Sequence, residues 1–273
     1  MPRPKPDLDA LRAKIAALEK RPLLAGNAGA IHAGAGDLLG LLQAPPGLLH
    51  EVFADEQRLC GAALGFTLGL AQGLLTQGRQ ALIYLQLGAE AQEIGLPYGL
   101  GIGAFGLTAD NLVIGRIAKI AELLWALEES LACRAVAGVI VDLASQPKAL
   151  DFTVSRRISL RAAAAGASAF LIRYGTGREA SAARLRWHVK PGVSAGQPFD
   201  ASAPGQPRFV VEVEKLRVGN LRQAEQHNLT LDWTENGFVS VDPRKQPLAP
   251  LRRTTPPSRP QPAALGDRLS EAC

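Results

Sequence analysis

The chain has 273 residues, of which 47% are hydrophobic, and this suits a globular protein with one large domain. Its formal charge of +5 lies at the two ends: residues 1–21 carry six Lys/Arg against three Asp/Glu, residues 243–273 carry six against two, and −2 remains for residues 22–242. Because residues 22–242 are nearly neutral, the composition argues against a protein that binds duplex DNA without a partner. The three cysteines are widely spaced, which argues against a disulfide framework or a zinc site.

Residues 1–22 are expected to form an amphipathic helix. Leu8, Leu11, Ile15 and Leu18 recur at helical spacing, and Pro22 marks the end. The segment begins with polar residues and does not have the apolar core of a signal peptide. The longest apolar run, residues 61–75, is shorter than the roughly 20 residues that cross a bilayer. We therefore expect a cytoplasmic protein with no membrane partner.

Residues 23–242 are expected to form the folded domain, in which strands and helices first alternate. Apolar strand segments are expected at 50–53, 81–86, 111–114, 137–142 and 169–173, and helices at 61–77, 117–131 and 152–166. This alternation is typical of βαβ units. The sequence therefore predicts an α/β fold with a mostly parallel sheet flanked by helices.

After residue 173 the pattern changes to short segments of alternating apolar and polar residues. They lie at 185–189, 209–214, 229–233 and 238–241, and Asn236-Gly237 between the last two is a strong signal for a hairpin turn. All four are expected to be antiparallel strands that extend one edge of the parallel sheet. Residues 243–273 hold seven prolines and no periodicity, so this basic tail is expected to be disordered on its own.

The connection after the first strand is the place where a P-loop enzyme binds phosphate. Such an enzyme has Gly-x-x-x-x-Gly-Lys-Ser/Thr there, whose backbone and lysine hold the phosphates and whose hydroxyl holds magnesium. This chain lacks the Gly-Lys-Ser/Thr and places two carboxylates in the loop. The residues are Ala54, Asp55, Glu56, Gln57, Arg58, Leu59, Cys60 and Gly61. We therefore expect no nucleotide binding, no cofactor, no metal and no ATPase activity.

Three acidic residues lie near strand ends. Asp142 ends the fourth strand, as the magnesium-binding aspartate of a P-loop enzyme would, and is interpreted as a vestige of such a residue or as a strand cap. Glu90 and Glu93 follow the second strand, where a water-activating glutamate could lie. A solvated loop fits these two glutamates better.

Three other segments have more than one interpretation. Gly101-x-Gly103-x-x-Gly106 is expected to be a flexible loop, because a dinucleotide site needs a strand before it and a helix after it. Arg173, Tyr174 and Arg178 follow the fifth strand and could contact phosphates or stack a base, as in single-stranded DNA binding, or belong to a solvated connection. The arginines of the third helix favour a solvated helix face; they are Arg156, Arg157 and Arg161.

Six short segments, in order along residues 8–242, have a familiar pattern. They are Leu11-Arg12-x-x-Ile15-x-x-Leu18-Glu19, Leu49-His50-Glu51-Val52-Phe53, Pro97-Tyr98-Gly99-x-Gly101, Leu124-Trp125-Ala126-Leu127-Glu128-Glu129-x-Leu131-x-Cys133-Arg134, Ala149-Leu150-Asp151-x-Thr153-x-x-Arg156-Arg157 and Ala182-Ala183-Arg184-x-Arg186-Trp187. No single segment is specific, but together they resemble the ImuA family of RecA-like accessory proteins from bacterial SOS mutagenesis cassettes.

The resemblance implies a RecA-like domain that works as a non-catalytic adaptor in translesion DNA synthesis after DNA damage. The implied partners are an ImuB-like polymerase relative without catalytic residues and an error-prone DNA polymerase subunit, with RecA and single-stranded DNA as further candidates. The family binds partners through its C-terminal region, which makes partner-binding candidates of Arg244, Lys245, Arg252 and Arg253. Two alternatives stay open: a RecA-like DNA-dependent ATPase with an unorthodox phosphate loop, and a SulA-like inhibitor of cell division.

Overall fold

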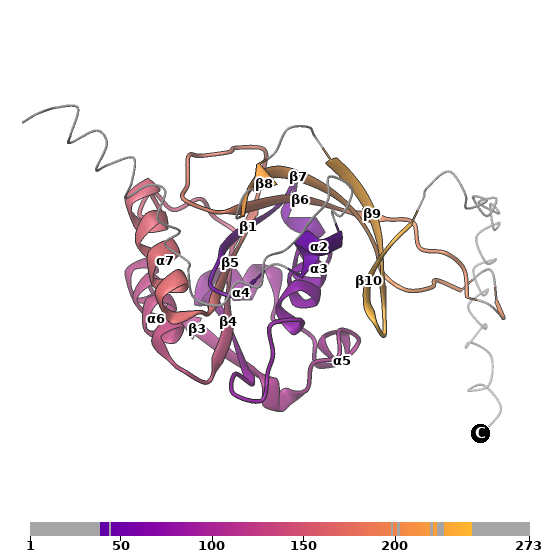
Figure 1. Cartoon of the computed structure of the whole chain (residues 1–273), viewed down its shortest axis with the longest axis horizontal. Coiled ribbons are helices and arrows are strands. Elements are labelled where there is room, and N and C mark those ends of the chain that lie inside the picture. The colour runs from indigo at the N-terminus through magenta and orange to yellow at the C-terminus, as the bar shows by residue number, and fades with distance from the viewer. Residues whose placement is uncertain are drawn as a thin grey trace, which may run out of the picture.

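A computed structural model describes residues 39–43, 45–197, 199–200, 203–218, 221–222 and 227–241 (Figure 1). The helix expected in residues 1–22 and the tail expected from residue 243 lie outside these ranges. So do the four candidate partner-binding residues of the tail, which are Arg244, Lys245, Arg252 and Arg253.

One mixed sheet runs through the described residues, in the order β10-β9-β7-β6-β1-β5-β4-β2-β3, with β8 beside β7. The neighbours from β6 to β3 are parallel, and β7, β9 and β10 continue the sheet in antiparallel pairs. The strands are β1 (Leu49–Ala54), β2 (Ala81–Leu87), β3 (Leu112–Ile117), β4 (Val136–Leu143), β5 (Ser168–Tyr174), β6 (Leu185–Gly192), β7 (Arg208–Val218), β8 (Leu221–Arg222), β9 (His227–Thr234) and β10 (Gly237–Ser240).

Helices cover both faces of the parallel strands (Figure 1). α6 (Ile120–Ala132) and α7 (Phe152–Ala165) pack on one face, and α3 (Cys60–Gln72) packs on the other. Because β1, β4 and β5 are covered on both sides, every residue in them is buried. The shorter helical elements are α2 (Leu39–Leu42), α4 (Gly88–Ile94), α5 (Gly99–Gly103), η1 (Gln57–Leu59) and η2 (Ala109–Asn111).

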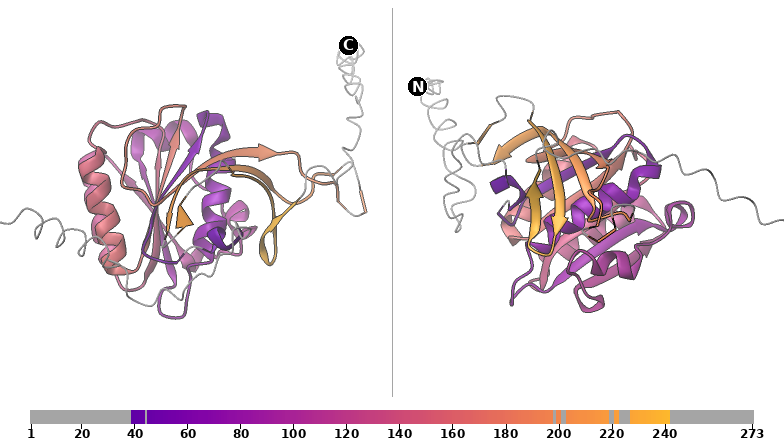
Figure 2. Two further views of the ribbon diagram at one scale, coloured as in Figure 1. Left: turned by 45° about the horizontal axis from the view of Figure 1, so that its top comes forward. Right: turned by 90° about the vertical axis from the view of Figure 1, so that its right-hand side faces the viewer.

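Helix α3 lies between the parallel strands and the antiparallel strands, which arch over it (Figure 2). Its sequence is apolar on every side, as expected for a helix that is covered all round. Phe66 is fully buried at its centre. The Phe66 ring lies 5.5 Å from the ring of Trp187 on β6 and 5.3 Å from the ring of Phe238 on β10, measured between centroids. The antiparallel strands therefore form the outer wall of this half of the core.

Replacing Gly69 with alanine should lower the free energy of unfolding by about 1–2 kcal/mol, since overpacking a close contact costs more than the gain in helix propensity. A Cβ at Gly69 would lie 2.5 Å from Cζ of Phe238 and 2.9 Å from Cζ3 of Trp233. Gly61 of the same helix is the matched control, because a Cβ there meets nothing within 4 Å. Urea denaturation of both variants tests the prediction, and equal stability would contradict it.

The structure confirms an α/β fold with a mostly parallel sheet and antiparallel C-terminal strands. It also confirms the hairpin at Asn236-Gly237, which joins β9 to β10 with Gly237 at φ +96°. The predicted direction of the segment at 185–189 is wrong, because β6 is parallel to β1 and antiparallel only to β7. Its alternating sequence has another cause: α3 covers one face of β6, while the other face is more exposed.

The glycine-rich segment also differs from its prediction as a flexible loop. Gly99–Gly103 forms the short helix α5. Ile102 and Phe105 are buried in the core beside α3, and this packing fixes the segment despite its three glycines.

Among the described residues, no helix combines the length and the apolar character needed to cross a membrane.

Candidate functional site at the carboxyl edge of the sheet

The loop between β1 and α3 is the segment in which the sequence lacks the phosphate-binding residues of a P-loop. It runs from Ala54 at the end of β1 through η1 to Cys60, the first residue of α3. Glu56 and Arg58 pair with each other at the surface, with Nη2 of Arg58 donating to Oε1 of Glu56 over 2.9 Å. Arg58, the one basic residue of this loop, is therefore paired with a carboxylate of its own loop.

Asp55, the other loop carboxylate, is tied to strand β6. Its Oδ1 lies 2.7 Å from Nε2 of His188, and its Oδ2 lies 3.2 Å from Nζ of Lys190. Burial acts to raise the pKa of Asp55, but hydrogen bonds and charge from Lys190 and His188 outweigh it and lower the pKa. The loop is thus anchored by an acidic side chain at the end of β1, where a phosphate-binding loop would present backbone amides.

Asp142 on β4 is enclosed by two tyrosines. Oη of Tyr84 on β2 donates to its Oδ2 over 2.8 Å, and Oη of Tyr174 on β5 donates to its Oδ1 over 2.9 Å. Only 2% of Asp142 is exposed. Burial raises the pKa of its carboxyl even though both tyrosine hydrogen bonds act in the opposite direction. Both carboxylate oxygens are therefore already engaged by the protein.

One amide, of Gln86, and one thiol, of Cys60, lie near this buried carboxylate. Gln86 lies in register with Asp142 on the neighbouring strand and is fully buried, and both polar atoms of its side chain lack a hydrogen-bond partner within the described part of the chain. Burial, followed by the charge of Asp142, raises the pKa of the Cys60 thiol at the start of α3. A thiol held neutral in this way is a poor nucleophile.

Glu90 was interpreted as part of a solvated loop, and this is wrong. It lies in α4 and is buried, and its carboxylate accepts hydrogen bonds from the backbone N–H groups of Ala144 and Ser145, each over 3.0 Å. The Ser145 hydroxyl donates to it as well. Glu90 therefore holds the turn that follows Asp142, whereas Glu93 is exposed.

The three candidate DNA-contacting residues are all held by contacts within the chain. Arg173 is 1% exposed, and Tyr174 is buried against Asp142. Nε of Arg178 lies 2.8 Å from Oε2 of Glu214, and its guanidinium stacks 4.0 Å from the centroid of the Phe53 ring. Contact with single-stranded DNA stays a prediction, and it would need these internal contacts to open.

A buried ionic cluster surrounds Glu51 of β1, and the sequence pattern did not predict it. The Oε2 atom of Glu51 accepts from Nη2 of Arg186 over 2.7 Å and from Oγ of Ser181 over 2.7 Å, and its Oε1 lies 3.6 Å from Nη1 of Arg173. Arg173 also pairs with Glu179 over 3.0 Å. The available signal was a glutamate within a segment expected to form a central strand, since a buried charge needs a buried partner.

Replacing Asp142 with asparagine should leave the free energy of unfolding at pH 8 equal to or above that of the wild type. The amide still offers an acceptor to one tyrosine and a donor to the other, and it removes a charge that burial disfavours. A raised pKa means that the folded state gains stability from protonated Asp142 at low pH and loses it as the pH rises through the folded pKa.

The alanine variant of Asp142 is the control, because it leaves two buried phenols without a partner at a cost of about 1–3 kcal/mol each. Urea denaturation at pH 5 and pH 8 separates the two variants. Equal destabilisation by asparagine and alanine would contradict the prediction.

These contacts hold the β1–α3 loop, the turn after β4 and the ends of the central strands together. Among residues 39–241 as described, no group of three His, Cys, Asp or Glu side chains is placed to hold a metal ion. Asp55, Arg58, Glu90, Asp142 and the Glu51 cluster all contact groups of their own chain. No protein-family model matches the sequence, and no curated protein is similar to it.

Proposed function

We propose that this chain is a RecA-like, non-catalytic adaptor that acts in the bacterial cytoplasm during SOS-induced translesion DNA synthesis, as its resemblance to the ImuA family implies. One observation carries the non-catalytic part of the proposal. The loop that would meet the phosphates of a nucleotide is held to β6 through Asp55, and Asp142, which stands where a P-loop enzyme has its magnesium-binding aspartate, is engaged by two tyrosines of the same protein.

A P-loop enzyme needs these positions in another state. Its loop must present backbone N–H groups and a lysine to phosphate, and its strand aspartate must be free and ionised to hold magnesium. Here Asp142 is enclosed by tyrosines with a raised pKa, and the loop is anchored through a carboxylate. These contacts favour the adaptor over the DNA-dependent ATPase, because ligand binding would have to break them.

The partners follow from the resemblance. They are an ImuB-like protein and an error-prone DNA polymerase subunit, with RecA and single-stranded DNA as further candidates. The parallel sheet, with the β1–α3 loop and Asp142 at the same edge, is compatible with a RecA-like scaffold.

Calorimetry on the purified full-length chain tests the nucleotide site directly. ATP with magnesium is titrated in, with and without a single-stranded oligonucleotide. We expect no heat of binding in either condition. Binding that disappears in Asp142→Ala would reject the non-catalytic assignment and favour the ATPase.

Complementation tests the cellular role. A strain that lacks the gene should show reduced mutation frequency after ultraviolet irradiation, restored by the wild type and equally by Asp142→Asn and Arg58→Ala. Purification of the tagged wild-type chain should retain a co-expressed ImuB-like protein. Absence of that complex, or a normal mutation frequency in the deletion strain, would overturn the adaptor proposal.

A further inference from the structure

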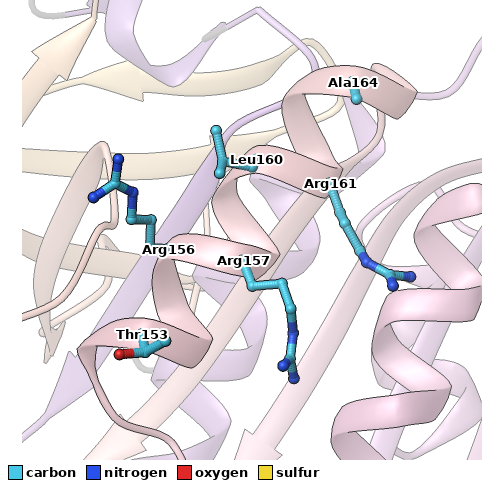
Figure 3. Close-up of a pocket in the computed structure, with 6 residues that line it drawn as sticks. All are labelled: Thr153, Arg156, Arg157, Leu160, Arg161 and Ala164. Atoms are coloured by element: carbon cyan, nitrogen blue, oxygen red, sulfur yellow. The ribbon is translucent and has the colours of Figure 1, made fainter.

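The outer face of α7 carries a stripe of exposed side chains that the site described above does not use. Helical spacing brings them to one face, where they line a shallow pocket of about 390 Å³ (Figure 3). We call this set the α7 stripe, and it consists of Thr153, Arg156, Arg157, Leu160, Arg161 and Ala164.

The arginines of the α7 stripe carry more N–H donors than the neighbouring carboxylates of α6 can satisfy. Arg157 and Arg161 share one buried acceptor, Glu128 of α6, whose oxygens lie 2.6 Å and 3.0 Å from their Nε atoms. Each guanidinium carries five N–H donors. The side chains of Arg157 and Arg161 remain 54% and 46% exposed. Arg161 also pairs with Glu129 of α6, whose Oε1 lies 3.6 Å from its Nη1. Several N–H donors of the two guanidinium groups therefore still face solvent.

Arg156 adds a third guanidinium, for which no ion pair is found among the described residues. In Figure 3 it points away from Arg157 and Arg161, so that positive groups lie on both sides of Leu160. Glu128 anchors the two arginines on the α6 side, because its own side chain is only 8% exposed. The stripe is thus preorganised to accept negative charge on either side of an apolar centre.

The centre of the stripe and the neighbouring helix expose large apolar groups. Leu160 is 52% exposed, Phe152 at the start of α7 is 49% exposed, and Trp125 on α6 is 66% exposed. Tryptophan and arginine are the side chains most often responsible for binding energy at protein interfaces. A nucleic acid would contact the arginines through phosphate but would leave Leu160 unused, whereas an amphipathic helix would use both.

We propose that the α7 stripe binds an acidic amphipathic helix of a partner protein, with apolar residues on Leu160 and carboxylates on Arg156, Arg157 and Arg161. This inference rests on the proposed function in one respect: both assume that the chain acts by binding partner proteins. It assigns that work to a surface of the folded domain, in addition to the C-terminal region that the family resemblance implies. The occupant is defined by its chemistry, a helix with leucine-type side chains on one face and glutamate or aspartate beside them.

Fluorescence anisotropy tests the proposal with a labelled synthetic helix of about 20 residues that has leucine at i, i+3, i+4 and i+7 and glutamate beside it. The full-length chain should bind this peptide, and Arg156→Glu and Leu160→Glu should each weaken the binding at least ~10-fold. Arg116→Glu, on the edge strand β3, is the matched control because Arg116 is also exposed. It should bind like the wild type.

The emission of Trp125 gives a second readout. Trp187 and Trp233 are buried, so a blue shift on adding the peptide should vanish in Trp125→Phe. Equal binding of a peptide with lysine in place of glutamate would overturn the proposal. So would displacement by a single-stranded oligonucleotide, or a wild-type dimer that Arg156→Glu dissociates. Failure of the ImuB-like complex with normal peptide binding would instead reject only the proposed function.

Discussion

Replacing Glu51 with alanine should lower the free energy of unfolding by about 3–5 kcal/mol, because it removes the buried carboxylate that faces the guanidinium groups of Arg173 and Arg186. Glu51 is 1% exposed and accepts hydrogen bonds from Arg186 and Ser181, and its second oxygen faces Arg173. Arg173 is itself 1% exposed, and its Nε already lacks a partner within the described residues. Loss of Glu51 therefore removes several charge-assisted bonds and leaves the buried charge of Arg173 with the exposed Glu179 as its carboxylate partner.

The matched control is Glu214→Ala, which breaks the ion pair with Arg178 in a region where both side chains are 21% exposed. We expect a loss of about 1 kcal/mol or less there, since solvent reaches both groups. Urea denaturation at pH 7 measures both variants. The double variant Glu51→Leu/Arg173→Leu should recover part of the loss. A Glu51→Ala variant as stable as Glu214→Ala would show that the cluster does not bear on stability.

Acidification from pH 7 to pH 4 should remove roughly 3 kcal/mol of folding free energy through His50 alone. His50 is stacked on Phe170 with ring centroids 4.6 Å apart, and its Nδ1 lies 3.4 Å from Nε1 of Trp187. Complete burial lowers its pKa from 6.5 to about 3. Between these values the unfolded chain binds a proton that the folded chain does not, so stability falls as the pH falls.

The variant His50→Asn isolates this contribution, because an amide oxygen can accept from Trp187 but does not titrate. It should be less stable than the wild type at pH 7, with a much flatter dependence on pH between 7 and 4. Asp55→Asn is the control for a lower pH range. Its pKa is lowered, so its contribution persists above 3.8 and is lost as the pH falls below that value. A wild type and a His50→Asn variant with parallel pH profiles would reject the prediction.

Most of the fold could be predicted, because apolar segments of the sequence indicate buried strands and helices. β4 and β5 are continuous apolar runs in the sequence, and both lie inside the sheet. The direction of β6 could not be predicted, because alternation reports which face is buried and not which neighbour the strand has. The helix at Gly99–Gly103 was missed for a similar reason: burial of Ile102 and Phe105, and not local propensity, stabilises it.

The candidate site could be predicted in position but not in its contacts. Asp142 is near the end of its strand, as expected, but its two tyrosine partners come from strands far away in the sequence. The sequence pattern predicts an accessible connection that includes Arg173 and Tyr174. The strand instead continues through Tyr174, which places both side chains inside the protein. Such pairings depend on the sheet order, which no local pattern contains.

The antiparallel strands that cover α3 have a consequence for synthesis on the ribosome. The apolar helix at residues 60–72 emerges early, but its outer wall is complete only when β9 and β10, at residues 227–240, have been made. Until then the nascent chain exposes Phe66 and its neighbours, a state that invites aggregation or capture by chaperones and proteases. Any truncated product that ends before β7 would keep this surface uncovered, so that quality control can distinguish incomplete chains from finished ones.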